Sequence, residues 1–238
     1  WVNRVNKVVL DGSIARFKTW LVGKGYTQIY GLDYGDTFSS VAKMTSICLF
    51  LAMTTIRHWS LHKLDIKNAF LNGELHEEVY MDQPLDFTTS GDSHLVCRLP
   101  RSIYSLKKSP RTWFGRFSST LIEFSMTQCE VDHSIFFLQS FFGLCTYLVV
   151  YVDDIVITSD DFDGICHLKS HLYSQFQMKD LNPLKYFLGI EVAQFASSIS
   201  IFYQKYTLDI LTKSGMVDCC PSVDFVASVQ ESTCNSDE

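Results

Sequence analysis

The amino-acid sequence predicts an α+β fold, an antiparallel sheet with helices packed on one face. Amphipathic helical patterns alternate along the chain with strand patterns, some of which form hairpins. No repeat, low-complexity tract or Pro/Gly-rich linker divides residues 1–215. The chain has 238 residues, of which 47% are hydrophobic and 19% charged. It can therefore bury a sizeable core, which excludes a wholly disordered or collagen-like protein.

The N-terminal segment is typical of a β-hairpin. Residues 5–10 and 15–22 flank Asp11-Gly12, a pair that accepts the positive φ of a tight hairpin turn. Residues 1–30 also hold five bases and one acid. We therefore expect a basic hairpin at this end.

Three segments show helical periodicity. The first ends near a short strand at residues 60–64. The second starts with Ser109 as N-cap and Pro110 at the first helical position. The third follows Asp160-Asp161. The predicted buried faces are Met44, Ile47, Cys48, Leu51, Ala52 and Ile56, then Trp113, Phe114, Phe117, Leu121 and Phe124, then Ile165, Leu168, Leu172 and Phe176.

Residues 134–152 contain no charged side chain and are long enough to cross a membrane. Polar residues and glycine interrupt them, and their apolar residues are mainly aromatic and β-branched, which fits strands better than a lipid-facing helix. We predict a hairpin, with strands at 134–138 and 144–152, and no membrane segment.

Asp153 and Asp154 interrupt an apolar run that extends from Leu148 to Ile157. Burying a charged pair costs several kcal/mol without compensation, so a tight turn that exposes the carboxylates to solvent or to cations is expected. Asp65 stands where another strand ends, before a short helical turn closed by Gly73. On pattern alone, an ordinary Asp-Asp turn and a functional site are about equally supported.

These three carboxylates, brought together from two strand ends, could hold two Mg²⁺ ions about 4 Å apart, the arrangement that polymerases use in phosphoryl transfer. Mn²⁺ is the alternative ion. Another cluster, Cys166, His167 and His171, lacks the Glu of a zincin and fits a solvated helix face better than a zinc site.

The residues around the three aspartates resemble the reverse transcriptase domain of copia-type LTR retrotransposons. Leu64-Asp65-Ile66-Lys67-Asn68-Ala69-Phe70-Leu71 and Tyr151-Val152-Asp153-Asp154 carry the resemblance. Further blocks follow in the order of the family, at residues 21–28, 38–44, 79–81, 109–114 and 184–191.

The resemblance implies a polymerase with fingers and palm, an RNA-directed DNA polymerase that extends a primer on an RNA or DNA template. Asp65, Asp153 and Asp154 would bind the catalytic metals. The family uses further positions for the incoming deoxynucleoside triphosphate, which correspond here to Ile66, Phe70, Lys18, Tyr104 and Tyr151. The carbonyl of Ile66 would be a metal ligand, and Phe70 would lie beneath the sugar. From its residues alone, Phe70 fits a core aromatic.

For template and primer, the resemblance points to two further segments. Lys107, Lys108 and Arg111 would contact nucleic acid, and Phe187, Leu188 and Gly189 match a hairpin that grips the primer end. A lone strand Gly is otherwise typical of a bulge. RNase H and integrase would accompany the domain in the full polyprotein.

The net charge of −6 at first argues against a nucleic-acid partner. The charge is unevenly distributed, however, because residues 98–116 hold six bases and no acid, with Tyr104, Trp113 and Phe114 among them. This segment fits a phosphate-binding surface or, equally, a solvated basic helix face.

The sequence departs from the family pattern at sensitive positions. Trp20 replaces a usual Arg in the triphosphate-binding segment, Ser105 a usual Gly, Ser40 a usual Pro and Cys48 a usual Arg. Loss of the guanidinium removes a bidentate phosphate contact. The alternative to an active polymerase is therefore a degenerate, catalytically inactive copy that retains the fold.

The predicted organisation is one fingers and palm domain over residues 1–215, with the start of a thumb near its end, and a loosely ordered acidic tail over 216–238. The absence of an initial Met leads us to expect a piece of a longer chain. Eight cysteines without CxxC spacing and no signal peptide favour a reducing location, in the cytoplasm or in virus-like particles.

Overall fold

A computed structural model of the chain describes residues 2–8, 14–37, 39–83, 95–181, 183–195, 199–202, 204–217 and 219, with side chains from residue 22 to 202 and from 207 within these ranges. It forms two compact units, one up to Leu184 and one made of residues 185–195 and the chain from Ile199 onward. The mixed fold with antiparallel sheets confirms the predicted class.

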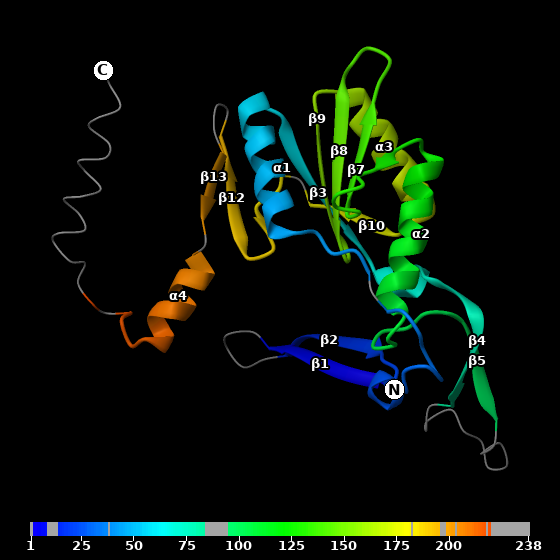
Figure 1. The fold of residues 1–238 in the computed structure, drawn as a ribbon. Helices are drawn as coiled ribbons and strands as arrows, with labels where there is room; N and C mark the ends of the chain where they lie inside the picture. The colour runs from blue at the N-terminus through cyan, green and yellow to red at the C-terminus, as the bar shows by residue number, and fades with distance from the viewer. Residues whose placement is uncertain are drawn as a thin grey trace, which may run out of the picture. The chain divides into compact units, whose positions relative to one another are not determined.

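The first unit is built on a six-stranded antiparallel sheet (Figure 1). Its order is β10-β3-β9-β8-β7-β6. The predicted hairpin over 134–152 is confirmed as β7 and β8, and no helix among the described residues is long and apolar enough to cross a membrane. The strands are β3 (Ser60–Ile66), β6 (Thr127–Gln128), β7 (Ile135–Gln139), β8 (Cys145–Tyr151), β9 (Asp154–Ser159) and β10 (Met178–Asp180).

Helices α2 (Ser109–Glu123) and α3 (Phe162–Gln175) cover one face of this sheet and bury the main core. The predicted apolar faces of both helices are confirmed, since all of their residues are buried in this core or packed against it. Helix α3 follows Asp160-Asp161 as predicted, and Asp161 caps it by accepting a hydrogen bond from Gly164 N at 2.8 Å. The sheet supplies Leu64, Ile66, Phe136, Leu148, Val150, Ile155 and Ile157 to the core.

Two details of the helix predictions are wrong. The N-cap of α2 is Lys108, because the Ser109 hydroxyl donates instead to the Ile103 carbonyl at 2.6 Å. The helices also do not all pack on one face of the sheet. The ring of Trp59, just after α1 (Met44–Arg57), stacks on Tyr147. Because side chains alternate along a strand, Tyr147 lies on the face opposite to that of the core residue Leu148, so α1 lies on that opposite face. In Figure 1 the strands run between α1 and the pair α2 and α3.

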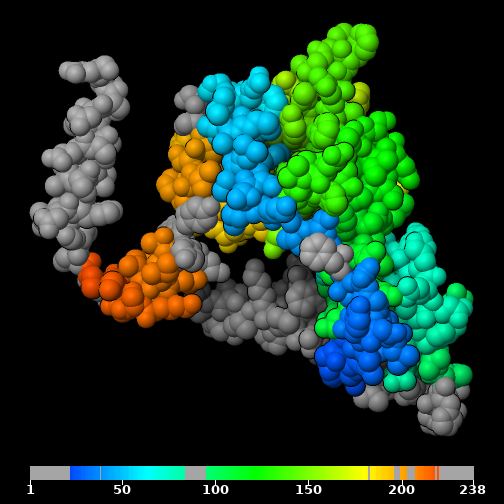
Figure 2. Space-filling view, in the orientation of Figure 1, coloured from blue at the N-terminus to red at the C-terminus, as the bar shows by residue number. Residues whose placement is uncertain are grey.

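The buried face of α1 also differs in part from the prediction. Ile47, Phe50, Leu51 and Thr54 are buried, whereas four predicted core positions are exposed. Apolar residues occur nearly all round this helix, so their spacing admits more than one stripe. Figure 2 shows α1, in light blue, at the molecular surface. The exposed positions are Met44, Cys48, Ala52 and Ile56.

Two hairpins complete the first unit. The predicted N-terminal hairpin is confirmed by the antiparallel pair β1 (Val2–Val8) and β2 (Ile14–Leu21), while its Asp11-Gly12 turn lies outside the described residues. Strands β4 (Glu74–Asp82) and β5 (Val96–Arg101) form the other. Short 3-10 helices lie at η1 (Gly25–Thr27) and η2 (Ala69–Asn72), the latter being the predicted helical turn.

The second unit contains a small antiparallel sheet, β11-β12-β13, followed by helix α4. Its elements are β11 (Tyr186–Phe187), β12 (Ile190–Gln194), β13 (Ile199–Phe202) and α4 (Gln204–Lys213). The predicted acidic tail, residues 216–238, falls almost wholly outside the described residues.

Candidate active site

A two-residue turn between β8 and β9 carries the paired aspartates. Tyr151 pairs with Asp154 across it, which leaves Val152 and Asp153 as the turn residues. Val152 has a φ of 56°, an unfavourable value for a β-branched residue. Such a conformation costs roughly 1–3 kcal/mol and persists only where the surroundings enforce it.

Two hydrogen bonds from other elements hold this turn. The buried indole of Trp113 in α2 donates from Nε1 to the Val152 carbonyl at 2.8 Å, and the Ile66 amide donates to the Asp153 carbonyl at 2.9 Å. Trp113 itself is 1% exposed and packs in the core. The suggestion that Trp113 forms part of a phosphate-binding surface is therefore wrong, because its ring is buried and its N–H is occupied.

The strand register places two of the three carboxylates opposite each other. Asp65 of β3 is the cross-strand partner of Asp154 of β9, so their side chains share one face. Asp153 lies exposed in the turn. Loss of hydration, together with the charges of Asp154 and Asp65, raises the pKa of the Asp153 carboxyl above its usual value. The three acids are thus electrostatically coupled.

Asp154 has a cationic partner. Lys63 Nζ lies 2.8 Å from Asp154 Oδ2 and carries a side chain only 12% exposed. Among the described residues, no three His, Cys, Asp or Glu side chains are arranged to hold a metal ion. The side chains nevertheless suit such an ion chemically, because carboxylate oxygens are the ligands that Mg²⁺ prefers. One of these oxygens already binds a cation, the ammonium of Lys63.

An aromatic pair borders the carboxylates. The rings of Phe70 and Tyr104 meet edge to face, with centroids 5.2 Å apart. Burial, followed by the charges of Asp153 and Asp65, raises the pKa of the Tyr104 hydroxyl, which places that hydroxyl in the field of both acids. Ser102 donates a hydrogen bond to the Phe70 carbonyl and fixes the start of η2. Phe70 is partly buried against the core rather than wholly within it.

The other nucleotide-binding candidates lie as follows. The side chains of Tyr151 and Ile66 are half-buried and buried in the sheet, respectively. The Ile66 amide, not a side-chain atom, contacts the aspartate turn. Lys18 and Trp20 belong to β2, whose side chains lie outside the described residues.

The basic candidates before and in α2 already have acidic or amide partners. Lys108 Nζ pairs with Glu77, and Arg111 Nη1 lies 3.2 Å from Asp36 Oδ2. The Lys107 amide donates to Gln28 Oε1 at 2.9 Å, and its side chain is exposed. Two of the three cations therefore have an acidic partner within the chain.

Phe187, Leu188 and Gly189 form the end of β11 and its tight turn into β12. Leu188 and Gly189 have φ values of 51° and 83°, so the predicted hairpin exists and its Gly lies in the turn, not in a bulge. Phe187 is buried within this unit. These residues belong to the second unit.

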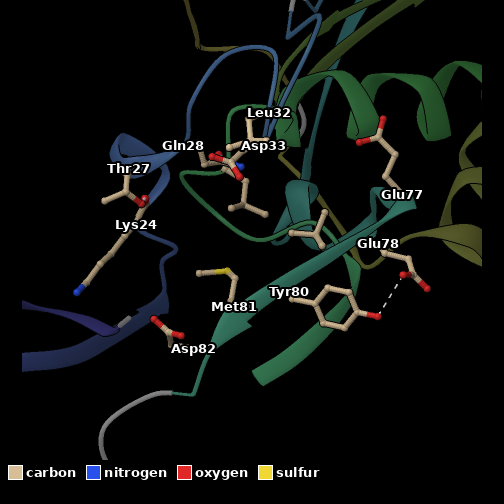
Figure 3. Close-up of a pocket in the computed structure, with 12 residues that line it drawn as sticks. Lys24, Thr27, Gln28, Leu32, Asp33, Glu77, Glu78, Tyr80, Met81 and Asp82 are labelled. Atoms are coloured by element: carbon tan, nitrogen blue, oxygen red, sulfur yellow. Dashed lines mark hydrogen bonds between the residues drawn. The ribbon is translucent and has the colours of Figure 1, made fainter. Parts of the chain in front are cut away.

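A separate pocket of about 360 Å³ lies between residues 24–33 and β4 (Figure 3). Lys24, Thr27 and Gln28 line it from one side and Met81 and Asp82 from β4. It does not include the three aspartates. Its mixture of one lysine with several acids makes it a poor site for a phosphate.

Comparison with known proteins identifies the family. A sequence model of the reverse transcriptase (RNA-dependent DNA polymerase) family matches residues 1–226. The chain belongs to the reverse transcriptase family. The resemblance to the copia-type domain is confirmed, because the polyproteins below match over most of the chain.

Among reverse transcriptase relatives, the retrovirus-related Pol polyprotein from transposon RE2 of Arabidopsis thaliana is 39% identical over 95% of this chain and 16% of its own length. That from transposon TNT 1-94 of Nicotiana tabacum is 35% identical over 93% of this chain and 17% of its own. The chain thus spans about a sixth of these relatives. A solved telomerase from Candida albicans covers 68% of this chain and 34% of its own, with 10% identity and a TM-score of 0.39.

The sequence-based predictions for this family member missed two residues at the aspartates. Lys63 precedes Asp65 by two positions in the same strand, so side-chain alternation would have placed it on the carboxylate face. The role of the Trp113 N–H had no local signal, because its partner lies 39 residues away.

Proposed function

We propose that this chain is the fingers and palm portion of a retrotransposon reverse transcriptase that extends a primer by adding deoxynucleotides on an RNA or DNA template. The β10-β3-β9-β8-β7-β6 sheet with its helices would be the palm, and the β1-β2 and β4-β5 hairpins the fingers. The domain would extend over residues 1–215, with the thumb beginning near its end.

One observation supports this function most directly: Asp65 and Asp154 are cross-strand neighbours beside a turn that presents Asp153. Asp65, Asp153 and Asp154 would hold two Mg²⁺ ions, or Mn²⁺ in their place, with the Ile66 carbonyl as a further ligand. When bound, such ions stabilise the charge on the attacking and leaving oxygens of phosphoryl transfer. The chain's own contribution is to hold Asp65 and Asp154 on paired strands and Asp153 in the turn beside them.

Phe70 and Tyr104 would receive the incoming nucleotide. Their edge-to-face contact forms an aromatic wall beside the acids, and the sugar of an incoming nucleotide would lie on Phe70. Lys18 and Tyr151 would contribute to the same site. Lys107, Lys108 and Arg111 would contact the template and residues 187–189 the primer, as in the family. RNase H and integrase would complete the polyprotein.

Primer extension tests this proposal. The chain is incubated with a primed RNA template, deoxynucleotides and Mg²⁺, beside an Asp153→Asn variant and an Asp163→Asn variant whose acid lies on the exposed start of α3. We expect extension by the chain and by Asp163→Asn, and none by Asp153→Asn. Equal signals from all three would contradict the proposal.

A second candidate is a degenerate copy that keeps the fold without catalysis. Ser105 favours it, because this residue takes a φ of 71° at a position where the resemblance leads one to expect Gly. The Trp20→Arg variant separates the two candidates. Extension that appears only after this substitution would establish a decayed enzyme, whereas activity of the unchanged chain would exclude one.

A further inference from the structure

Lys63 brings a positive charge into the group of three carboxylates. Its Nζ lies 2.8 Å from Asp154 Oδ2, and the two side chains are 12% and 31% exposed. In the β3-β9 register, Lys63 pairs with Val156 and Asp65 with Asp154. Lys63 is therefore the diagonal neighbour of Asp154 on the carboxylate face of the sheet.

This ion pair takes up part of one carboxylate of the three. Among the residues that the structure describes, no three acidic, His or Cys side chains are gathered around a common metal position. The ammonium contacts Oδ2 of Asp154, so a divalent ion that used this oxygen would compete with Lys63 for it. The contact also shows that this position accepts a cation and that oxygen donors are available to it.

The pair is more than a surface contact. The lysine side chain is nearly covered, so solvent screens its attraction to the carboxylate less than it would for an exposed pair. Both residues lie in neighbouring paired strands, so the register itself brings their Cβ atoms close together. A metal ion that bound Asp154 through both oxygens would have to displace the ammonium.

We propose that Lys63 is a positioning residue: it holds Asp154 as an internal counter-ion and must release this carboxylate before a divalent metal ion binds there. The inference rests on the proposed function, which assigns the metal to these aspartates. It has two consequences. The affinity for a divalent metal ion is lower than it would be for the three carboxylates without Lys63. The Lys63 amine is released from Asp154 when the metal ion binds.

Binding of Mn²⁺, measured by electron paramagnetic resonance without nucleic acid, tests the proposal. We compare the unchanged chain with Lys63→Met, Lys63→Arg and, as a matched loss of charge, Lys67→Met, an exposed lysine beyond β3. Removal of a cation a few ångströms from the site should tighten binding about tenfold in Lys63→Met. Lys63→Arg and Lys67→Met should bind as the unchanged chain does.

The double variant of Lys63→Met with Asp154→Asn locates the effect, because the gain should vanish when the carboxylate is absent. If Lys63→Met does not fold, as judged by circular dichroism, the unchanged chain decides the question. Reductive methylation of the Lys63 amine, followed by mass spectrometry, should become severalfold faster when Mn²⁺ is added, while methylation of Lys67 stays constant.

The outcomes separate the two proposals. If the unchanged chain binds Mn²⁺ and a folded Lys63→Met variant binds it no more tightly, the role of Lys63 is overturned and the metal assignment stands. Where only methylation can be read, a constant rate at Lys63 in the presence of bound Mn²⁺ has the same meaning. If neither the chain nor any variant binds Mn²⁺, the metal assignment fails together with the inference.

Discussion

The indole N–H of Trp113 donates to the carbonyl of Val152 at a distance of 2.8 Å. A residue of the helical core thereby holds the backbone of the aspartate turn, in which Val152 has a positive φ. The Ile66 amide holds the other turn carbonyl, that of Asp153. The turn is thus fixed by its surroundings rather than by its own sequence.

Trp113→Phe should therefore weaken both folding and primer extension. The substitution keeps an aromatic ring in the core but leaves the Val152 carbonyl without its donor, which should lower the free energy of unfolding by about 1–3 kcal/mol. Urea unfolding measures the stability. Trp59→Phe is the control, since this ring stacks on Tyr147 away from the turn. Full extension activity in Trp113→Phe would show that the hydrogen bond does not position the aspartates.

Ser105→Gly should stabilise the chain. Ser105 has a φ of 71°, a conformation that costs a residue with a Cβ roughly 1–2 kcal/mol. The greater backbone entropy that Gly loses on folding offsets part of this, so a gain of about 0.5–1 kcal/mol is expected in urea unfolding. As a control, Ser119→Gly on the exposed side of α2 should lose about 0.5 kcal/mol. A loss at Ser105 would contradict the strain argument.

Two glycines near each other in the fold should respond oppositely to alanine. A Cβ on Gly73 would lie 2.6 Å from Thr112 Oγ1 and 2.8 Å from Trp113 N, so Gly73→Ala should cost about 1–3 kcal/mol. A Cβ on Gly115, inside α2, would meet no atom within 4 Å, and Gly115→Ala should gain about 1 kcal/mol. Thermal unfolding of both variants checks this, and equal midpoints would refute it.

Asp132 should make stability depend on pH. Its carboxylate is buried and accepts hydrogen bonds from Ser134 N at 3.1 Å, from Ser134 Oγ at 2.5 Å and from Lys43 N at 3.1 Å. Burial alone would raise the pKa of Asp132, but the hydrogen bonds from Ser134, Ser46 and Lys43 together outweigh it and lower the pKa. The ionised carboxylate therefore stabilises the fold at pH values above the usual pKa of an Asp, near 3.9. This stabilisation is lost as the pH falls from there through the lowered pKa of the folded state.

Urea unfolding at neutral and acidic pH, with a chelator present, measures this effect. Asp132→Asn should be less stable than the unchanged chain at neutral pH, and the difference should shrink in acid. Asp153→Asn should instead be more stable than the unchanged chain at neutral pH. The pKa of Asp153 is raised, so ionisation of this carboxyl destabilises the fold as the pH rises. The same trend in both variants would contradict the assignment of these shifts.

Local patterns predicted most of the elements. The start and apolar spacing of α3 and the apolar hairpin of β7 and β8 depend on neighbouring residues, and both were predicted correctly. The N-cap of α2 was not, because the Ser109 hydroxyl bonds a carbonyl outside the helix. The interactions that shape the site join distant residues, as in Lys63 with Asp154, 91 positions apart, and no periodicity reports such contacts.

The ion pairs of Lys108 with Glu77 and of Arg111 with Asp36 alter the expected response of nucleic-acid binding to salt. A base that turns from an acid to a phosphate exchanges one ion pair for another. Salt weakens the ion pair that is lost as well as the phosphate contact that is gained. Affinity should therefore decline with rising salt less steeply than the six bases of residues 98–116 would suggest.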